Sequence, residues 1–178
     1  MGYDMTVELS ALNEIFVEFY YWITVPLMFL IHVGFCLYEV SISRAKNHMH
    51  TLMKNAMLIP MVTITMFLFG FWIYFAAQGP FGSFAGGSTG LPWDASMGSN
   101  LGDHIMGVFW AAFLLFSWTA ASIVSGAVIE RIRTGAFLIL AVLVGSITWM
   151  IDAAWGWSAG GWMVTDWGYH DAYASGVI

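Results

Sequence analysis

The sequence predicts an all-α integral membrane protein, organised as a multi-span helical bundle, and three observations carry that prediction. Hydrophobic residues make up 60% of the chain and charged residues only 9%, whereas about a quarter of the residues of a soluble domain are charged. Four apolar runs are each long enough to cross a bilayer, which needs about 20 residues of helix. The basic residues fall in two short clusters, as expected of turns on the cytoplasmic side: Arg44, Lys46, Lys54, Arg131 and Arg133.

The first expected span covers residues 15–38, long enough for about 36 Å of helix at 1.5 Å per residue. We expect this span to enter from the outside. We also expect it to be retained in the mature protein, because the preceding segment lacks the basic residues of a signal peptide. His32 lies deep in this span. An intramembrane histidine is a functional candidate by default, but a hydrogen bond to a neighbouring helix is the favoured interpretation here.

The remaining expected spans cover residues 57–77, 104–129 and 135–153, and a fifth starts at residue 171. The second span ends in aromatic residues typical of a membrane interface. A glycine-rich loop at 79–103, which has turn chemistry and no apolar periodicity, is expected to join it to the third span on the outer side.

Two features of the third span and the C-terminal segment are candidates for packing or for binding. Phe109, Phe113 and Phe116 are spaced by four and three residues, which places them on one helical face; such a stripe more often packs than binds a ligand. The tryptophans of segment 155–167 are typical of an interface, and their indole faces also attract cations.

Cysteine and histidine usage predicts no metal site, and we expect the chain to need no cofactor and not to be an enzyme. Cys36 is the only cysteine, so an intrachain disulfide and a thiolate cluster are excluded. The histidines are not spaced as metal ligands on a single span. We expect four of them to lie at the membrane surfaces: His48, His50, His104 and His170.

Four sequence blocks, in the same order, resemble the N-terminal half of the ammonium transporter family and its related Rh proteins. They are EVSISRAKNHMHTLMKN at 39–55, SGAVIERIRTGAF at 125–137, WGWSAGGWM at 155–163 and DAYASGVI at 171–178. The resemblance covers essentially the whole chain. It implies a single transmembrane domain over 1–178 that forms the first half of an inverted-repeat fold, with four full spans and the start of a fifth.

The resemblance also implies three site residues. Phe116, counted back from the Glu130–Arg131 pair, is similar to the aromatic residue that lines the outer vestibule and gates the pore. Trp157 resembles the tryptophan beside the external recruitment site, where an ammonium ion is held by cation–π attraction. Asp171 resembles the aspartate that organises that site.

The chain departs from the family pattern at several positions. Phe113 stands where family members usually carry a glutamine, and Ala172-Tyr173-Ala174 replaces the family's Phe-Ala-Gly. The first of the paired pore histidines is expected directly after Ile178, and the second in the other half. Residues 1–178 alone are therefore expected to be unstable or inactive.

The function that the resemblance implies is transport of ammonium or ammonia across the cell membrane. In that hypothesis NH4⁺ is recruited at an outer aromatic and acidic vestibule, deprotonated, and conducted through a hydrophobic pore as a neutral molecule, with the proton on a separate route. The N-terminus is expected outside the cell. The partners are the lipid bilayer, two further copies in a homotrimer and a cytosolic regulatory protein; no nucleic acid is expected. Whether NH3 or NH4⁺ is conducted stays open.

Two other hypotheses compete with transport. The chain could be an ammonium-sensing module of a signalling protein, which requires a cytoplasmic extension. It could also be a structural or electron-carrying membrane subunit, in which His32 pairs with a histidine on a neighbouring span.

Overall fold

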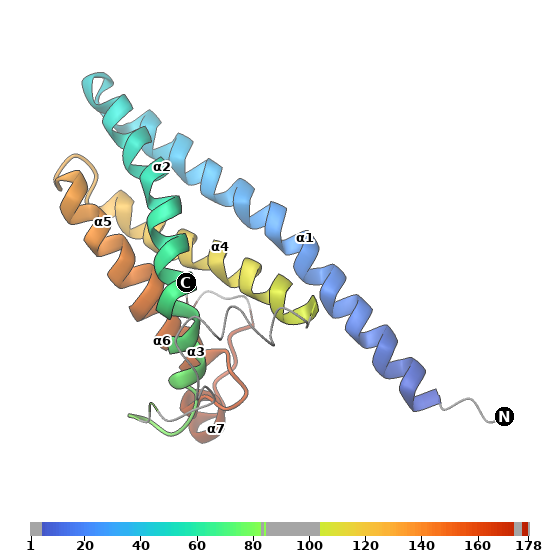
Figure 1. The fold of residues 1–178 in the computed structure, drawn as a ribbon. Coiled ribbons are helices and arrows are strands. Elements are labelled where there is room, and N and C mark those ends of the chain that lie inside the picture. Colours follow the sequence, from blue (N-terminus) through green and yellow to red (C-terminus); the bar gives the residue numbers. More distant parts are fainter. Residues whose placement is uncertain (1–4, 83, 85–103, 173–175, 178) are drawn as a thin grey trace.

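The described structure, a computed structural model covering residues 5–82, 84, 104–172 and 176–177, is a bundle of four long helical rods (Figure 1). The rods are Leu9–Ile42, Ala45–Ala76, Ile105–Ala127 and Thr134–Gly156, and each is long and apolar enough to cross a membrane. Every regular element in the described ranges is helical. The prediction of a multi-span all-α membrane protein is therefore confirmed.

Two of the rods are divided into segments by short π-helical stretches. The elements in chain order are α1 (Met5–Ile42), the 3₁₀ turn η1 (Ala45–Asn47), α2 (His48–Thr65), the π-helix η2 (Met66–Gly70), α3 (Phe71–Ala76), α4 (His104–Ala127), α5 (Thr134–Val142), the π-helix η5 (Leu143–Thr148), α6 (Trp149–Gly156) and α7 (Trp162–Trp167). Thus α2, η2 and α3 form the second rod, and α5, η5 and α6 form the fourth.

The first two rods begin before the apolar runs from which they were predicted, whereas the third, predicted over 104–129, ends at Ala127. The first continues through the acidic residues before residue 15, and the second begins at His48 rather than at residue 57. The extra turns of α2 are polar, yet Thr51, Lys54 and Asn55 are buried, because neighbouring helices supply partners for them. A length criterion based on apolar residues alone misses such turns.

The expected outer loop at 79–103 falls almost entirely outside the described residues. The same holds for part of the expected fifth span. Ala172, Gly176 and Val177 lie in turns, and Tyr173 lies outside the described part of the chain.

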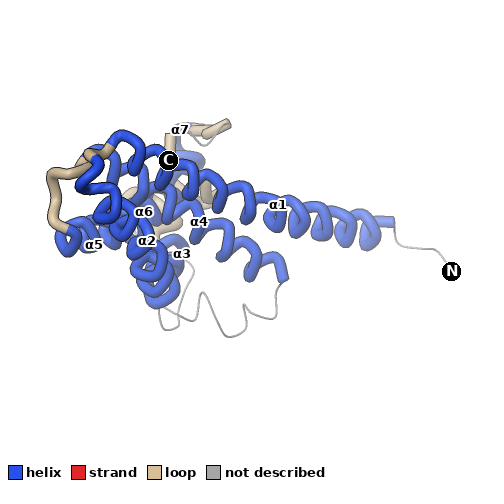
Figure 2. The backbone as a smooth tube through the Cα atoms, turned by 90° about the horizontal axis from the view of Figure 1, so that it is seen from above, coloured by secondary structure: helices blue, strands red, loops and turns tan. Residues whose placement is uncertain are grey.

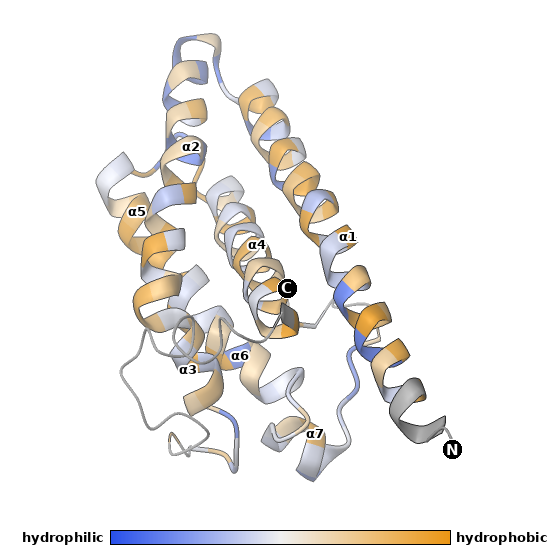
Figure 3. Ribbon diagram, turned by 45° about the vertical axis from the view of Figure 1, so that its right-hand side comes forward, coloured by the Kyte–Doolittle hydropathy of each residue, from blue (hydrophilic) through white to orange (hydrophobic). Residues whose placement is uncertain are grey.

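Helix α4 occupies the middle of the bundle, packed along α1 and also against α2 and α5. The turn between α1 and α2 and the turn between α4 and α5 lie at the same end (Figure 1), and Figure 2 shows α1 running along one side of the other helices. Hydrophobic residues cover the helices along most of their length, whereas the turn between α1 and α2 is hydrophilic (Figure 3). We call the end with these two turns the basic end and the opposite end, around α3, α6 and α7, the aromatic end.

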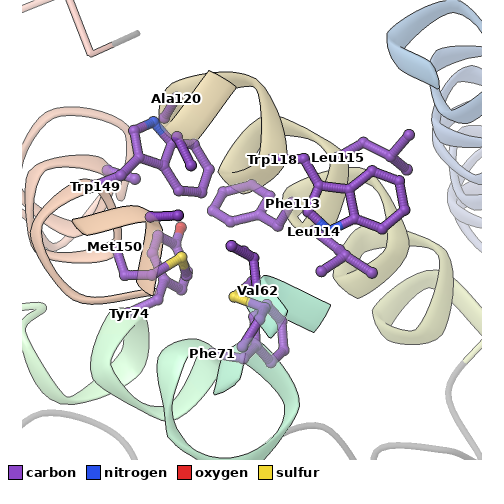
Figure 4. Close-up of a cluster of buried hydrophobic side chains, with 14 of the residues drawn as sticks. Val62, Phe71, Tyr74, Phe113, Leu114, Leu115, Trp118, Ala120, Trp149 and Met150 are labelled. Carbon is purple, nitrogen blue, oxygen red and sulfur yellow. The ribbon is translucent and has the colours of Figure 1, made fainter. Parts of the chain in front are cut away.

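The core between α3, α4 and α6 is built of large rings (Figure 4). Phe71 and Tyr74 on α3 contact Phe113 on α4, with ring centroids 6.4 and 4.9 Å apart. Phe113 also contacts Trp149 on α6, at 5.5 Å. Such tilted and edge-to-face pairs add to the stabilisation from burial alone, and they fix the level of α6 against α4.

Glycines allow close approach at the two π-helical stretches: Gly70 of η2 lies against Ser146 of η5, and Gly145 of η5 lies against Ser117 on α4. The hydroxyl groups of Thr65 and Ser146 lie 2.7 Å apart, and the Ser117 hydroxyl donates to the Gly145 carbonyl at 2.9 Å. A π-helical turn disturbs the regular ladder of backbone bonds, and these hydroxyls supply partners inside the membrane, where water cannot. A Cβ atom at Gly145 would lie 3.0 Å from both Ser117 oxygens and 3.2 Å from Val62.

Gly145→Ala should therefore destabilise the bundle by about 1 to 3 kcal/mol, the usual cost of overpacking a filled interior. Thermal unfolding of the purified protein in detergent measures this as a lower midpoint. Gly34→Ala is the matched control, because nothing lies within 4 Å of its added Cβ, and its midpoint should stay level or rise slightly. Equal midpoints for the two variants would contradict the close approach.

A clasp between Arg44 and Glu130 joins the two turns of the basic end. The Arg44 side-chain Nε lies 2.9 Å from Glu130 Oε2, and the Arg44 backbone N–H donates to Glu130 Oε1 at 2.6 Å. Glu130 has a φ of 59°, which non-glycine residues rarely adopt. The backbone N–H of Arg44, followed by the Asn47 side chain, lowers the pKa of the Glu130 carboxyl.

The Glu130 clasp should make stability depend on pH. Because the folded pKa lies below the unfolded one, the contribution is complete above the unfolded pKa and is lost as the pH falls through the folded pKa. Glu130→Gln should thus lower the thermal midpoint at neutral pH, and its difference from the unchanged protein should shrink on acidification. Glu14→Gln, which alters an exposed carboxylate on α1, is the control and should have no such effect. A pH-independent difference would count against the clasp.

Candidate functional site

The three predicted site residues come together at the aromatic end. The Trp157 indole Nε1 donates a hydrogen bond to Asp171 Oδ2 at 2.9 Å. The rings of Trp157 and Phe116 meet edge to face, with centroids 5.5 Å apart and planes at 80°. Phe116 comes from α4, whereas Trp157 follows α6 directly and Asp171 lies beyond α7, so three separate segments build this cluster.

Local structure explains how Trp157 and Asp171 reach each other. Trp157 ends α6 with its backbone N–H bonded to the Ala153 carbonyl at 2.9 Å. Helix α7 ends at Gly168, whose φ of 63° is left-handed. There Tyr169 N–H bonds to Met163 O at 2.9 Å and Gly168 N–H to Val164 O at 3.1 Å. The bond from the Gly168 N–H to the Val164 carbonyl is the single bond of an αL ending, and this ending turns the chain back toward Trp157.

The Asp171 carboxylate is held by several donors. Besides Trp157, the backbone N–H groups of Gly176 and Val177 each lie 3.3 Å from Oδ2. Charge-assisted hydrogen bonds of this kind fix a carboxylate in place. A pocket of about 370 Å³ opens beside it, lined by Gly156, Trp157, Ala159, Val164, Tyr169, His170 and Asp171.

An aromatic wall stands behind the three residues. Trp149 stacks on Phe116, with centroids 6.2 Å apart and planes at 14°, and lies edge to face with Trp157 at 5.9 Å. Phe113, which stands where the resembling family usually has a glutamine, is buried and lies 6.1 Å from the Trp157 ring. The departure therefore replaces a polar side chain by a ring within the same wall.

Sequence reasoning missed Trp149, Asp152 and Tyr169 as members of this region. Burial, followed by the Asp171 and Asp152 carboxylates, raises the pKa of the Tyr169 phenol. The spacing of Trp149, Asp152 and Gly156 by three and four residues was the available signal, because it places them on one face of α6. Asp152 and Trp149 also line a neighbouring pocket of about 500 Å³.

This arrangement has the chemistry to receive a small cation. A fixed carboxylate attracts positive charge, and indole and phenyl faces attract cations through their quadrupole. Within the described ranges, no group of three or more histidine, cysteine, aspartate or glutamate side chains is placed to hold a metal ion.

A separate polar cluster lies inside the basic end, and it corrects the expectation for Lys54. That lysine was counted with the cytoplasmic turn, but its side chain is 3% exposed and its Nζ lies 3.7 Å from Glu39 Oε2. Whereas Lys46 lies in the preceding turn η1, Lys54 lies within α2, on the face that meets α1 and α4. An ion pair with Glu39 makes its burial possible.

His32 has the helix-to-helix contact that was predicted for it. Its Nδ1 lies 3.4 Å from the Ser122 hydroxyl on α4, and Ser122 in turn lies 3.5 Å from Asn55 Oδ1 on α2. His48, His50 and His170 are exposed, as expected of residues at membrane surfaces.

Comparison with known proteins decides the family. A family model described as the Ammonium Transporter Family matches residues 19–178. The chain belongs to the ammonium transporter family. This agrees with the four blocks from which the resemblance was drawn.

Individual transporters of the family align with most of the chain. Ammonium transporter Amt2 of Haloferax mediterranei is 34% identical over 155 residues, 85% of this chain and 32% of its own length. The ammonium transporter of Bacillus subtilis is 34% identical over 143 residues, 77% of this chain and 34% of its own. Ammonium transporter Amt2 of Archaeoglobus fulgidus is 31% identical over 139 residues, 77% of this chain and 28% of its own length.

The chain thus spans about a third of the length of the curated relatives that it matches. No solved structure matches it.

Proposed function

We propose that this chain contributes the outer mouth of a membrane transporter for ammonium, where Phe116, Trp157 and Asp171 recruit NH4⁺. Membership of the ammonium transporter family supports ammonium as the transported species. The observation that carries the site is the Trp157–Asp171 hydrogen bond at 2.9 Å, made while the Trp157 ring meets Phe116. These two contacts bring a charge and two aromatic rings from three separate segments to one place.

The roles in this proposal follow from the chemistry of each side chain. Asp171 supplies negative potential that raises the local concentration of cations. Trp157 offers an indole face, the strongest of the aromatic partners for a cation. Phe116 closes the inner side of the site as an apolar gate. Moving a bare ion past such rings is costly, so NH4⁺ gives up its proton and crosses as a neutral molecule while the proton follows a separate route.

The proposal includes an orientation and partners. The aromatic end faces outward with the N-terminus, and the basic end faces the cytoplasm, as the clustering of Lys and Arg favours. The assembled transporter is a homotrimer, and a cytosolic regulatory protein docks at the turns of the basic end. Residues 1–178 constitute one transmembrane domain of this assembly.

Uptake of labelled methylammonium by cells that make the whole gene product tests the site. Trp157→Leu removes the indole and should weaken apparent affinity by about 2- to 30-fold, the equivalent of a cation–π contact worth about 0.5 to 2 kcal/mol. Trp157→Phe keeps a ring but loses the N–H donor, so its apparent affinity should fall between those of the unchanged protein and of Trp157→Leu. Asp171→Asn should reduce both uptake and affinity, because it removes the charge and an acceptor for three donors.

Asp166→Asn is the matched control for charge, since Asp166 is an exposed carboxylate on α7 that accepts a hydrogen bond from the adjacent Thr165 hydroxyl at 3.1 Å. It should leave uptake near the level of the unchanged protein. Normal methylammonium affinity in Asp171→Asn or Trp157→Leu, at equal membrane abundance, would reject the proposed site.

The orientation can be tested with an amine-reactive reagent that does not cross membranes. Lys46 is exposed in η1, so in intact cells it should stay unlabelled and should react only after permeabilisation. Lys54 is buried and should resist labelling in both conditions, which makes it an internal control in the same peptide map. Labelling of Lys46 from outside would show that the basic end faces outward.

A further inference from the structure

We propose that Glu39, Ser125 and Phe137 form a binding site for a primary ammonium group at the basic end of the bundle, occupied in this structure by the side chain of Lys54. The site lies apart from Trp157 and Asp171 and does not depend on the proposed function. Its ligand class is an alkylammonium ion that carries N–H donors.

Three different partners surround the Lys54 ammonium nitrogen. The Ser125 backbone carbonyl oxygen accepts a hydrogen bond from it at 3.3 Å. Glu39 Oε2 lies 3.7 Å away, and the centroid of the Phe137 ring lies 4.7 Å away. These partners come from α1, α4 and α5, so the site forms only where the helices meet.

The partners match a primary ammonium group better than other cations. Such a group is a compact point charge with three N–H donors on a slim stem, and here it meets a carbonyl, a carboxylate and a ring face. A tetraalkylammonium ion has no N–H to donate to the carbonyl or carboxylate. A planar guanidinium needs a wider, fork-shaped arrangement of acceptors.

The carboxylate of the site is held in place by groups other than the lysine. Glu39 Oε2 accepts a hydrogen bond from Asn55 Nδ2 at 2.8 Å, and Glu39 Oε1 accepts one from the Ser125 hydroxyl. Asn55 is itself anchored to the Thr51 carbonyl at 3.2 Å. Glu39 is 1% exposed. A carboxylate buried so fully needs a cation, because an uncompensated charge in the interior is strongly destabilising.

Two roles of Lys54 lead to different expectations. If the lysine only fills space and links helices, any neutral group that fills the volume should replace it. If the surroundings form an ammonium site, only a cation with N–H donors should do so. Lys54→Ala separates the two roles, because it removes the three carbons beyond Cβ and the nitrogen, which together correspond to n-propylammonium.

The experiment measures the thermal midpoint of the whole gene product in detergent, for the unchanged protein and for Lys54→Ala, as propylammonium chloride is titrated. Lys54→Ala should have a lowered midpoint that rises saturably, by about 2 to 4 °C at a concentration about five times the dissociation constant. The unchanged protein should not respond, since Lys54 fills the site. Two controls at equal concentration should give no rise: 1-propanol, which is neutral and of the same size, and tetramethylammonium, which has no N–H.

A second variant covers the case in which Lys54→Ala fails to fold. The double variant Glu39→Gln with Lys54→Ala removes both charges of this site, so it should accumulate in the membrane and should not respond to propylammonium. Rescue of Lys54→Ala by propanol as well as by propylammonium would overturn the proposal. So would a lack of response in folded Lys54→Ala, failure of Lys54→Ala to fold with propylammonium present, or failure of the neutral double variant. Because the readout is stability rather than uptake, failure here leaves the proposed transport site unaffected.

Discussion

A polar group inside a bilayer has no water to bond, so its partner must come from the protein, and this constraint organises the bundle. At the basic end, Glu39 receives hydrogen bonds from Asn55 and Ser125 and pairs with Lys54. Halfway along, Ser117 donates to a carbonyl of the π-helical stretch in the fourth rod. Each bond joins two different helices, and together the bonds set the register between rods that lipid-facing apolar surface alone would leave free to slide.

The two ends of the bundle supply partners for their polar groups in different ways. At the basic end the buried Glu39 and Lys54 pair with each other, and the outer turns are joined by Arg44 and Glu130. The aromatic end holds Asp171 with neutral donors, from Trp157 and two backbone amides, so its negative charge is oriented without being neutralised by those donors. An oriented carboxylate next to ring faces is an arrangement that attracts a cation. A carboxylate already paired with an internal lysine holds its cation instead.

Sequence patterns predicted much of this structure, for identifiable reasons. Long apolar runs and clustered basic residues depend on composition along the chain, so four spans and a shared end for the two basic turns followed directly. Spacing placed Phe109, Phe113 and Phe116 on one helical face, and all three are indeed part of the ring cluster. The resemblance supplied Phe116, Trp157 and Asp171, which the fold brings together. Their roles in ammonium recruitment stay a prediction.

The sequence by itself determined that the molecule is a multi-span helical membrane protein. Hydropathy and charge patterning are properties of consecutive residues, and they decide directly which segments enter a bilayer. Only the tertiary structure decided which polar residues meet. Lys54 is close in sequence to the exposed Lys46, and nothing local distinguishes the two, yet one is buried against Glu39, 15 residues earlier in the chain. Contacts across helices depend on rotation and register, and those are set by packing between distant segments, which no local pattern encodes.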